Sequence, residues 1–341
     1  MNLLQTPITI NKLPLKNRLI LPPMAYIKGD DASRVTDALC AYYDEKAASG
    51  LFGLIVSEHC FVSPEGQASE RQISISRDSD IPGLRKLVET IHRHNVPVFA
   101  QINHAGGAAR RAVTRMEPLS PSGIHSPGLG DPDLPPAILT ALDMKRIAAD
   151  FAAAALRAKE AGFDGVEVHA AHAYLLCQFL SPLLNHRTDE YGGPSITDRL
   201  CFPLEVFAAV RAAVGPDYPV SVRLGACDYL PGGNTAADAA LAASAFARAG
   251  ADLLDVSGGA CYYRRPGHTE PGYFSDQTTA IRRALQDSAS AVPVVLTGGI
   301  YTAAQAETFL QNGAADMIGI GRSALKGTWE AGARGTVLLA P

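Results

Sequence analysis

Short apolar runs recur along the chain, and each precedes a segment that is polar enough to form a surface helix or a loop. Runs of only a few Val, Ile, Leu and Phe residues are typical of strands buried on both faces of a parallel sheet. Eight runs are predicted as strands: residues 18–24, 52–58, 96–104, 165–171, 218–226, 251–259, 292–300 and 315–322. The helical spacing of apolar residues between them is clearest at 141–161 and 236–249.

Local signals mark where several of these elements begin. Thr140, Thr235 and Thr302 each precede a helical segment and are followed three residues later by Asp or Gln. That spacing predicts a capping box, in which the two side chains satisfy backbone groups at the start of a helix. Residues 7–16 alternate apolar and polar positions around Asn11-Lys12, which predicts a short β-hairpin ahead of the main fold.

Eight strands that alternate with helices predict an α/β fold, namely a (β/α)₈ TIM barrel. A doubly wound open sheet is the alternative, because the sequence alone does not show that the strands close into a circle. We find no internal repeat, low-complexity tract or linker, so residues 1–341 are predicted to form a single domain.

Two loops stand out by length and composition. Residues 105–139 follow the third strand, are rich in Gly, Pro and Ser, and are predicted to be irregular. Residues 260–272 follow the sixth strand. Long loops in compact domains are usually functional, so we expect both to act as lids over the carboxyl ends of the strands.

The composition narrows the class of protein. With 47% hydrophobic and 19% charged residues, the chain should fold around a substantial core. A formal net charge of −4 gives no reason to expect nucleic acid as a partner. We find neither an apolar run long enough to cross a membrane nor a signal peptide, which predicts a cytoplasmic protein with no membrane partner. No two of the six cysteines form a C-x-x-C pair, which disfavours zinc-ribbon and iron–sulfur sites.

The strongest candidate for chemistry follows the fourth strand. His169, His172 and Tyr174 come in close succession where the apolar run GVEV ends. An α/β fold places its functional groups at the carboxyl ends of its strands. These side chains could instead merely cap the strand and bond loop carbonyl groups, but three hydrogen-bonding side chains together favour a functional site.

The other strand ends are also polar or glycine-rich. They carry Gln101, Asn103 and His104 on the third strand, Arg223 on the fifth, Gly298 and Gly299 on the seventh, and Gly319, Gly321 and Arg322 on the eighth. In TIM barrels a phosphate commonly binds the loops after strands seven and eight. Glycines let backbone N–H groups approach an anion, and an arginine adds a charge-assisted hydrogen bond. The last two loops therefore predict a ligand that carries a phosphate.

Two other readings of these motifs are disfavoured. His169 and His172 are three positions apart at a strand end and have no evident third partner, so we predict no metal site. The segment GIGRSA at 319–324 matches the spacing of a dinucleotide-binding fingerprint. A Rossmann unit needs a further strand with an acidic residue about 20 positions on, and little chain remains for one.

Together these residues resemble the old yellow enzyme family of FMN-dependent ene-reductases. The resemblance runs from PITINKLPLKNRLILPPM near the start to GIGRSALKGTW near the end, and its most specific part is HAAHAYLLCQFLSPLLNHRTDEYGG at 169–193. Pro23-Met24, AQINHAG, VSVRLG, TGGI and GIGR support it. Members of this family are FMN-binding (β/α)₈ barrels that use NADH or NADPH to reduce the C=C bond of activated alkenes.

The resemblance implies a role for each matching position. Gln101 would hydrogen-bond the flavin pyrimidine ring, and Arg223 would lie near the N1–C2 carbonyl edge of the flavin. The phosphate of FMN would be held by Gly298, Gly299, Gly321 and Arg322. His169 and His172 would bind the carbonyl oxygen of the substrate, and Tyr174 would give the proton.

The chain also departs from the family pattern. Pro23 and Met24, expected against the cofactor, are followed by Ala25, where the family usually has a Thr or Cys that hydrogen-bonds near flavin O4. Ala25 cannot make that bond. The HAGR segment of the family is here His104-Ala105-Gly106-Gly107, so its arginine is missing.

We therefore predict an FMN oxidoreductase that reduces α,β-unsaturated carbonyl compounds, with a small-molecule enone as its partner. The rivals are a relative acting oxidatively as a desaturase or amine demethylase, a flavin-free barrel lyase or aldolase, and a non-catalytic protein that binds a phosphate ligand. Arg115, Arg264 and Arg265 on the two lids suggest an anionic substrate such as a carboxylate or CoA ester, unless they are merely solvated loop charges. Arg264 is the one we assign to substrate binding. The choice between NADH and NADPH, and whether the chain forms a homo-oligomer, stay open.

Overall fold

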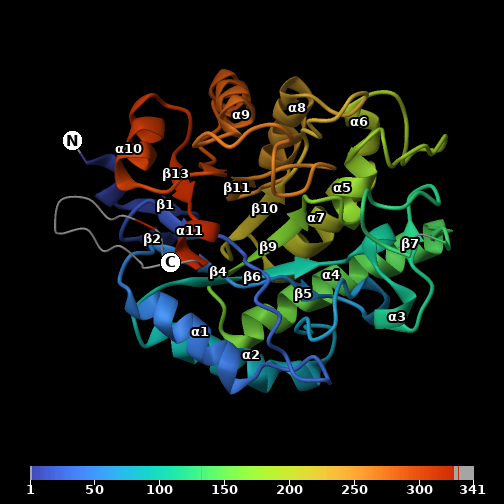
Figure 1. Cartoon of the computed structure of the whole chain (residues 1–341), viewed down its shortest axis with the longest axis horizontal. Coiled ribbons are helices and arrows are strands. Elements are labelled where there is room, and N and C mark those ends of the chain that lie inside the picture. The colour runs from blue at the N-terminus through green and yellow to red at the C-terminus, as the bar shows by residue number, and fades with distance from the viewer. Residues whose placement is uncertain (1, 132, 326–328, 330–341) are drawn as a thin grey trace.

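Eight parallel strands close into a barrel in the computed structural model, which describes residues 2–131, 133–325 and 329 (Figure 1). The barrel strands are β3 (Leu19–Leu21), β4 (Leu54–Val56), β6 (Val98–Asn103), β9 (Gly165–Ala170), β10 (Val220–Leu224), β11 (Leu253–Val256), β12 (Val294–Thr297) and β13 (Met317–Gly319). The circle closes because β13 pairs with β3 and β4 pairs with β6. All eight predicted strands are present, so the TIM barrel is confirmed and the doubly wound sheet is excluded.

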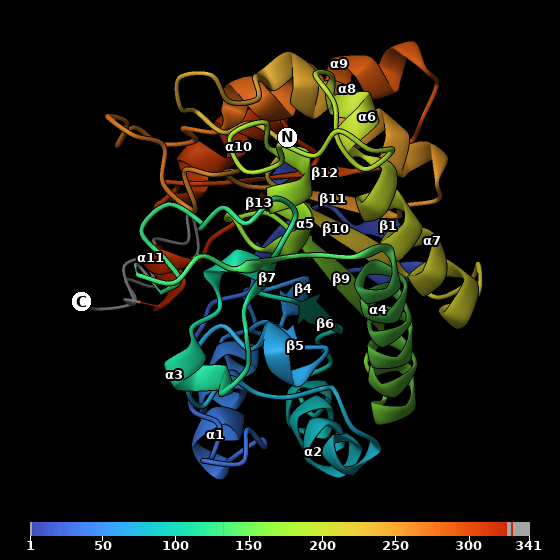
Figure 2. The same cartoon turned by 90° about the vertical axis from the view of Figure 1, so that its right-hand side faces the viewer.

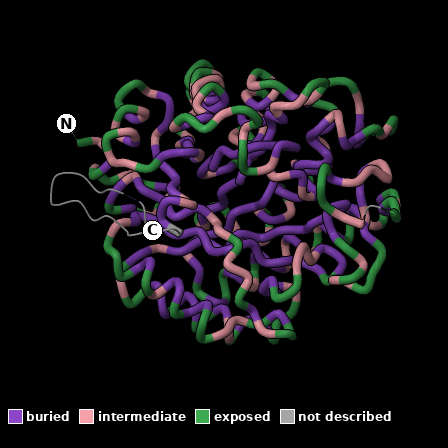
Figure 3. Tube along the Cα trace, viewed as in Figure 1, coloured by how far each residue is buried: buried purple, intermediate pink, exposed green. Residues whose placement is uncertain are grey.

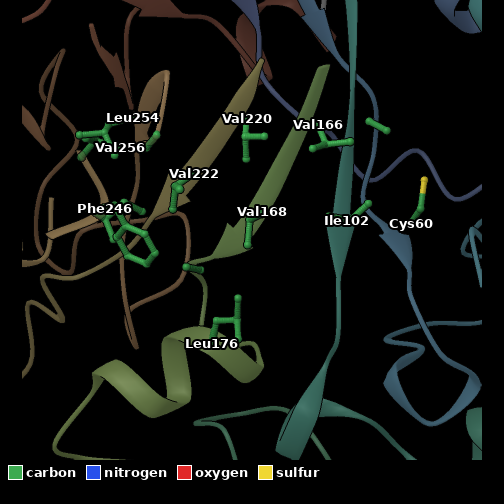
Figure 4. Packing of buried hydrophobic residues seen from close by; sticks show 14 of the residues in the cluster. Cys60, Ile102, Val166, Val168, Leu176, Val220, Val222, Phe246, Leu254 and Val256 are labelled. Carbon is green, nitrogen blue, oxygen red and sulfur yellow. The ribbon is translucent and has the colours of Figure 1, made fainter. Parts of the chain in front are cut away.

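Alternation of side chains along the strands produces two apolar layers. One set, which includes Phe99, Leu253 and Met317, forms a cluster inside the barrel. The alternate residues face the helices, where Figure 4 shows Val166 and Val168 of β9 beside Val220 and Val222 of β10. The barrel is thus a packed core rather than a pore.

The predicted hairpin is confirmed and closes one end of the barrel. Strands β1 (Ile8–Ile10) and β2 (Leu13–Leu15) pair antiparallel, and Asn11 in the turn has φ 56°. Asn tolerates this left-handed conformation better than most residues. Ile10 and Leu15 join the apolar cluster inside the barrel, so the functional groups must lie at the opposite end.

Helices surround the strands, and exposed residues lie on their outward faces and in the loops between elements (Figures 1, 2 and 3). The longer helices are α1 (Asp37–Ala48), α2 (Ile81–His92), α4 (Ala141–Ala161), α7 (Cys201–Val214), α8 (Ala236–Arg248), α9 (Ser275–Asp287) and α10 (Ala303–Gln311). The capping boxes predicted at Thr140, Thr235 and Thr302 are present. Among the described residues, no helix is both long and apolar enough to cross a membrane.

The loop after the third barrel strand is more regular than predicted. Residues 105–139 contain α3 (Arg111–Thr114) and two short parallel strands, β7 (Leu119–Ser120) and β8 (Ala137–Ile138). A distant side chain holds the base of this loop, because Arg187 Nη1 donates to the carbonyl groups of Pro121 and Leu139 at 2.9 Å each. Apart from these short elements and a 3₁₀ turn at Gly106–Ala108, the described part of the segment is irregular, as predicted.

Three short helices and one short strand complete the surroundings of the site. They are α5 (Leu175–Leu180), α6 (Ile196–Arg199), α11 (Arg322–Leu325) and β5 (Cys60–Phe61). Residues 1 and 330–341 of the predicted domain, and Lys326 to Thr328 of the family-like segment, lie outside the described residues.

Candidate active site

A cavity of about 620 Å³ opens at the carboxyl ends of the barrel strands. Every residue predicted to contact cofactor or substrate lines it: Pro23, Met24, Ala25, Gln101, His169, His172, Tyr174, Arg223, Arg264, Gly298, Gly299, Gly321 and Arg322. Both predicted lids reach the cavity, Leu129 from the first and Tyr262, Tyr263 and Arg264 from the second. Residues far apart in the sequence therefore share one enclosed space.

A tight turn after β9 brings three polar rings together. His172 and Ala173 have φ 59° and 55°, a left-handed conformation that non-glycine residues rarely adopt. The turn is held by a hydrogen bond from the His172 N–H to the Gly258 carbonyl oxygen at 3.1 Å. As a result, the ring centroid of His169 lies 5.0 Å from that of His172 and 5.2 Å from that of Tyr174.

Burial sets the protonation of these three side chains. It holds the pKa of His169 and His172 well below the ordinary value, and the nearby Arg223 charge lowers both further. Burial also raises the pKa of Tyr174 to about 12, with a further contribution from Tyr263. At neutral pH the site therefore holds two neutral imidazoles and a protonated phenol.

A network of buried charges lies beside the rings. Arg223 forms an ion pair with Asp255, the residue opposite it on β11, and is also the register partner of His169 on β9. Glu167 accepts hydrogen bonds from Gln101 Nε2 and Ser221 Oγ, both at 2.9 Å. Burial, and after it the Asp255 charge, raise the pKa of Glu167 to about 8 against the opposing effect of the Arg223 charge.

The raised pKa of Glu167 predicts a pH-dependent stability. Because the folded protein holds a proton that the unfolded chain releases above its ordinary pKa of 4.5, stability should fall as pH rises from 4.5 to about 8. Glu167→Gln imitates the protonated side chain and lacks this dependence. Relative to the variant, the wild type should lose up to ~1.4 kcal/mol per pH unit in this window. Urea unfolding at pH 5, 6, 7 and 8 measures it, and parallel stability curves would contradict it.

Glycines shape the opposite end of the cavity. Gly298 and Gly299 have φ 108° and 67°, and a Cβ at Gly298 would lie 2.7 Å from the Tyr273 ring. A Cβ at Gly321 would lie 2.6 Å from Met24 Sδ. Arg322 lies beside these turns and donates a hydrogen bond to the Tyr273 hydroxyl group. A side chain at Gly298 or Gly321 would clash with its neighbours. Because these residues are glycines, their backbone N–H groups can be approached by an anionic ligand.

These features fit FMN. Arg223 Nε is buried without a protein partner among the described residues, which is rare for a strong donor and calls for a ligand acceptor. Gln101 also lines the cavity, where its side-chain amide would hydrogen-bond a heterocycle. The glycine turns and Arg322 stand where a phosphate would be held, and the cavity is large enough for an isoalloxazine ring and its substrate.

Some residues that we singled out lie elsewhere. Asn103 and His104 are buried but do not line the cavity; His104 Nε2 lies 3.9 Å from Glu65. Of the three lid arginines, only Arg264 lines the cavity, with its guanidinium carbon 5.6 Å from the centroid of the Tyr263 ring. Arg265 instead pairs with Asp276 at 3.2 Å.

The sequence analysis missed several polar lining residues, among them His59, Ser257, Tyr263 and Tyr273. His59 directly follows the second predicted strand and could have been found by the strand-end rule that identified the others. Among the described residues, no group of three or more His, Cys, Asp or Glu side chains is arranged to hold a metal ion.

Comparisons with known proteins identify the family of this chain. The model of the NADH:flavin oxidoreductase / NADH oxidase family matches residues 3–328. A metal reductase of Desulforamulus reducens is 39% identical over 326 residues, which are 95% of this chain but 47% of that protein. The chain thus spans about half the length of that relative. An NADPH dehydrogenase of Bacillus subtilis (strain 168) is 37% identical over 322 residues, covering 94% of this chain and 90% of that protein.

Solved structures show the same relationship. The old yellow enzyme homologue from Zymomonas mobilis superposes with a TM-score of 0.79 at 28% identity, covering 94% of this chain and 88% of that one. Morphinone reductase gives 0.80 at 31% identity, covering 94% and 85%. The family match confirms the predicted resemblance and the predicted cofactor, FMN, and the chain belongs to the NADH:flavin oxidoreductase / NADH oxidase family, which includes the old yellow enzymes.

Proposed function

We propose that this chain is an NAD(P)H-dependent FMN oxidoreductase that reduces the C=C bond of α,β-unsaturated carbonyl compounds. The observation that carries the proposal is the convergence of two neutral imidazoles and a protonated phenol on one cavity. The ring centroid of His169 lies 5.0 Å from that of His172 and 5.2 Å from that of Tyr174. A set of this kind suits a reaction in which an oxygen gains negative charge while a neighbouring carbon gains a proton.

The side chains divide this work between them. When FMN is bound, its chemistry would supply the hydride for the β-carbon of the alkene. His169 and His172 donate hydrogen bonds to the carbonyl oxygen, which stabilises the charge that develops there. Tyr174, protonated at neutral pH, gives its proton to the α-carbon as a general acid.

The names of related proteins support a nicotinamide as reductant. One relative is an NADPH dehydrogenase, and morphinone reductase has been solved with tetrahydroNAD bound. In the proposed reaction, NADH or NADPH and then the alkene occupy the same cavity in turn. The cytoplasmic location stays a prediction.

Anaerobic spectroscopy of the purified protein tests the proposal. Flavin absorbance should be present, should bleach on addition of NADH or NADPH, and should return when 2-cyclohexenone is added, with cyclohexanone as product. A protein reconstituted with FMN that stays colourless would support the flavin-free lyase or the phosphate-binding protein. Alkene formation that requires an external electron acceptor would support a desaturase.

Ala25 predicts a measurable change in the flavin potential. A thiol or hydroxyl at this position would hydrogen-bond near flavin O4 and stabilise the reduced state. One such bond contributes about 0.5–1.5 kcal/mol, or roughly 10–30 mV for two electrons. We expect Ala25→Cys and Ala25→Thr to raise the potential by this amount, measured against a reference dye. Ala25→Val adds bulk but no hydrogen-bond donor, so it should not raise the flavin potential. An unchanged potential in Ala25→Cys would contradict the prediction.

A further inference from the structure

A third histidine, His59, faces the same space as His169 and Tyr174. It follows β4, directly before β5, and is one of the residues that line the cavity. Its ring centroid lies 5.5 Å from that of Tyr174 and 6.2 Å from that of His169. None of the roles described above uses this side chain.

Its neighbours determine which ring nitrogen carries hydrogen. The Oε1 atom of Gln72 accepts a hydrogen bond from the backbone N–H of Ala68 at 2.7 Å, so the other end of this amide is the NH₂ group. That group lies 2.8 Å from His59 Nδ1 and donates to the His59 carbonyl oxygen at 3.1 Å. His59 Nδ1 must therefore be an acceptor, which leaves the hydrogen on Nε2.

The same neighbours keep the ring neutral. A hydrogen on Nδ1 would point at the amide of Gln72 and at Asn103 Nδ2, which lies 3.3 Å away. The N–H groups of Gln72 and Asn103 would then face a third N–H group on His59 Nδ1, which is unfavourable. Burial also lowers the pKa of His59 to about 4. His59 is therefore a fixed neutral donor, and among the described residues its hydrogen bonds are made by Nδ1 and the carbonyl oxygen, not by Nε2.

The position of His59 differs from that of His172. His169 is the ring neighbour of both, at 6.2 Å and 5.0 Å, whereas Tyr174 is a ring neighbour of His59 and His169. A substrate carbonyl held between His169 and His172 thus leaves the His59 N–H free for another part of the same molecule. An alkyl group placed there would leave a largely buried donor unpaired, which disfavours binding.

We propose that His59 determines specificity by donating the Nε2 hydrogen to a second acceptor on the substrate, which favours alkenes with a carbonyl group at each end of the C=C bond. Ene-diones and quinones have this chemistry. The proposal rests on the proposed function, since it takes one carbonyl to be held by His169 and His172. Sites that hydrogen-bond a substrate group discriminate against analogues that lack it.

Binding to the oxidised FMN-loaded protein without NAD(P)H tests this, because no turnover then occurs. The probes are (E)-3-hexene-2,5-dione and (E)-3-hexen-2-one, which differ by one carbonyl oxygen, and the readout is the change in flavin absorbance. We expect the wild type to bind the dione about 10-fold more tightly. His59→Leu should reduce that ratio to below about 2-fold while leaving the affinity for hexenone nearly unchanged.

Two more variants separate a lost donor from a damaged fold. His59→Gln keeps a side-chain N–H and should retain part of the preference. His92→Leu removes a half-exposed histidine that pairs with Asp164 on the outside of the barrel, and should keep the full ratio. An unchanged ratio in His59→Leu, or an equal loss in His59→Gln and His59→Leu, would overturn the role of His59. Failure of the wild type to bind either compound would overturn the proposed function itself.

Discussion

Replacing Tyr174 with Phe should slow alkene reduction by about 10²–10⁴-fold, the range expected for loss of a general acid. The variant keeps the aromatic ring, whose centroid lies 5.2 Å from that of the His169 ring and 5.5 Å from that of the His59 ring. The cavity should therefore retain its shape. The step in which NAD(P)H is consumed needs no proton from the phenol and should proceed at nearly the wild-type rate. Stopped-flow measurement of the two half-reactions separates these effects.

Tyr263→Phe is the matched control for that variant. Tyr263 lines the same cavity but is 55% exposed, and it lies next to His172 rather than His169. Loss of its hydroxyl group should change alkene reduction by only a few-fold. If Tyr174→Phe reduced alkenes at the wild-type rate, the proton would have to come from another group or from solvent, and the role proposed for Tyr174 would be wrong.

The sequence was sufficient for the barrel and for most of the lining of its cavity. Apolar runs identified all eight strands, and the carboxyl ends of parallel strands must meet at one end of a closed barrel. The polar and glycine residues at those ends therefore lie close together in the barrel. His59 was missed although it obeys the same rule, because it is followed by the apolar residues Cys60, Phe61 and Val62.

Long-range contacts were the features that the sequence could not predict. Arg187 donates hydrogen bonds to the carbonyl groups of Pro121 and Leu139, which lie next to the short strands of residues 105–139 and are 66 and 48 positions away from it in the sequence. The pairing of Arg223 with Asp255 depends on the register of β10 against β11, which a sequence pattern does not specify. The charge of Arg223 is thus partly balanced by a partner that the resemblance did not suggest.

Removal of the Asp255 charge, which balances Arg223, should have a large effect on stability. Asp255 is 1% exposed and Arg223 is 5% exposed, so Asp255→Asn leaves a buried guanidinium without its counter-ion. Removal of one member of a buried ion pair typically costs about 3–5 kcal/mol. Glu167 lies close enough to Asp255 and Arg223 for their charges to alter its pKa, and with Asp255 neutral it can ionise in its place. We therefore expect Asp255→Asn alone to cost only about 1–3 kcal/mol at pH 8.

The full cost should emerge when both carboxylates are removed. At pH 8 Glu167→Gln alone should be more stable than the wild type, because the wild type has by then lost the stability that the Glu167 proton contributes. Adding Asp255→Asn to Glu167→Gln should lose about 3–5 kcal/mol relative to Glu167→Gln alone. Urea unfolding of all four proteins at saturating FMN completes a double-mutant cycle, in which a common cofactor concentration keeps the contribution of binding comparable. Additive changes in the free energy of unfolding would mean that Glu167 does not neutralise Arg223. A non-additive loss would mean that either carboxylate can balance the guanidinium, so that its net charge beside the flavin depends on both of them.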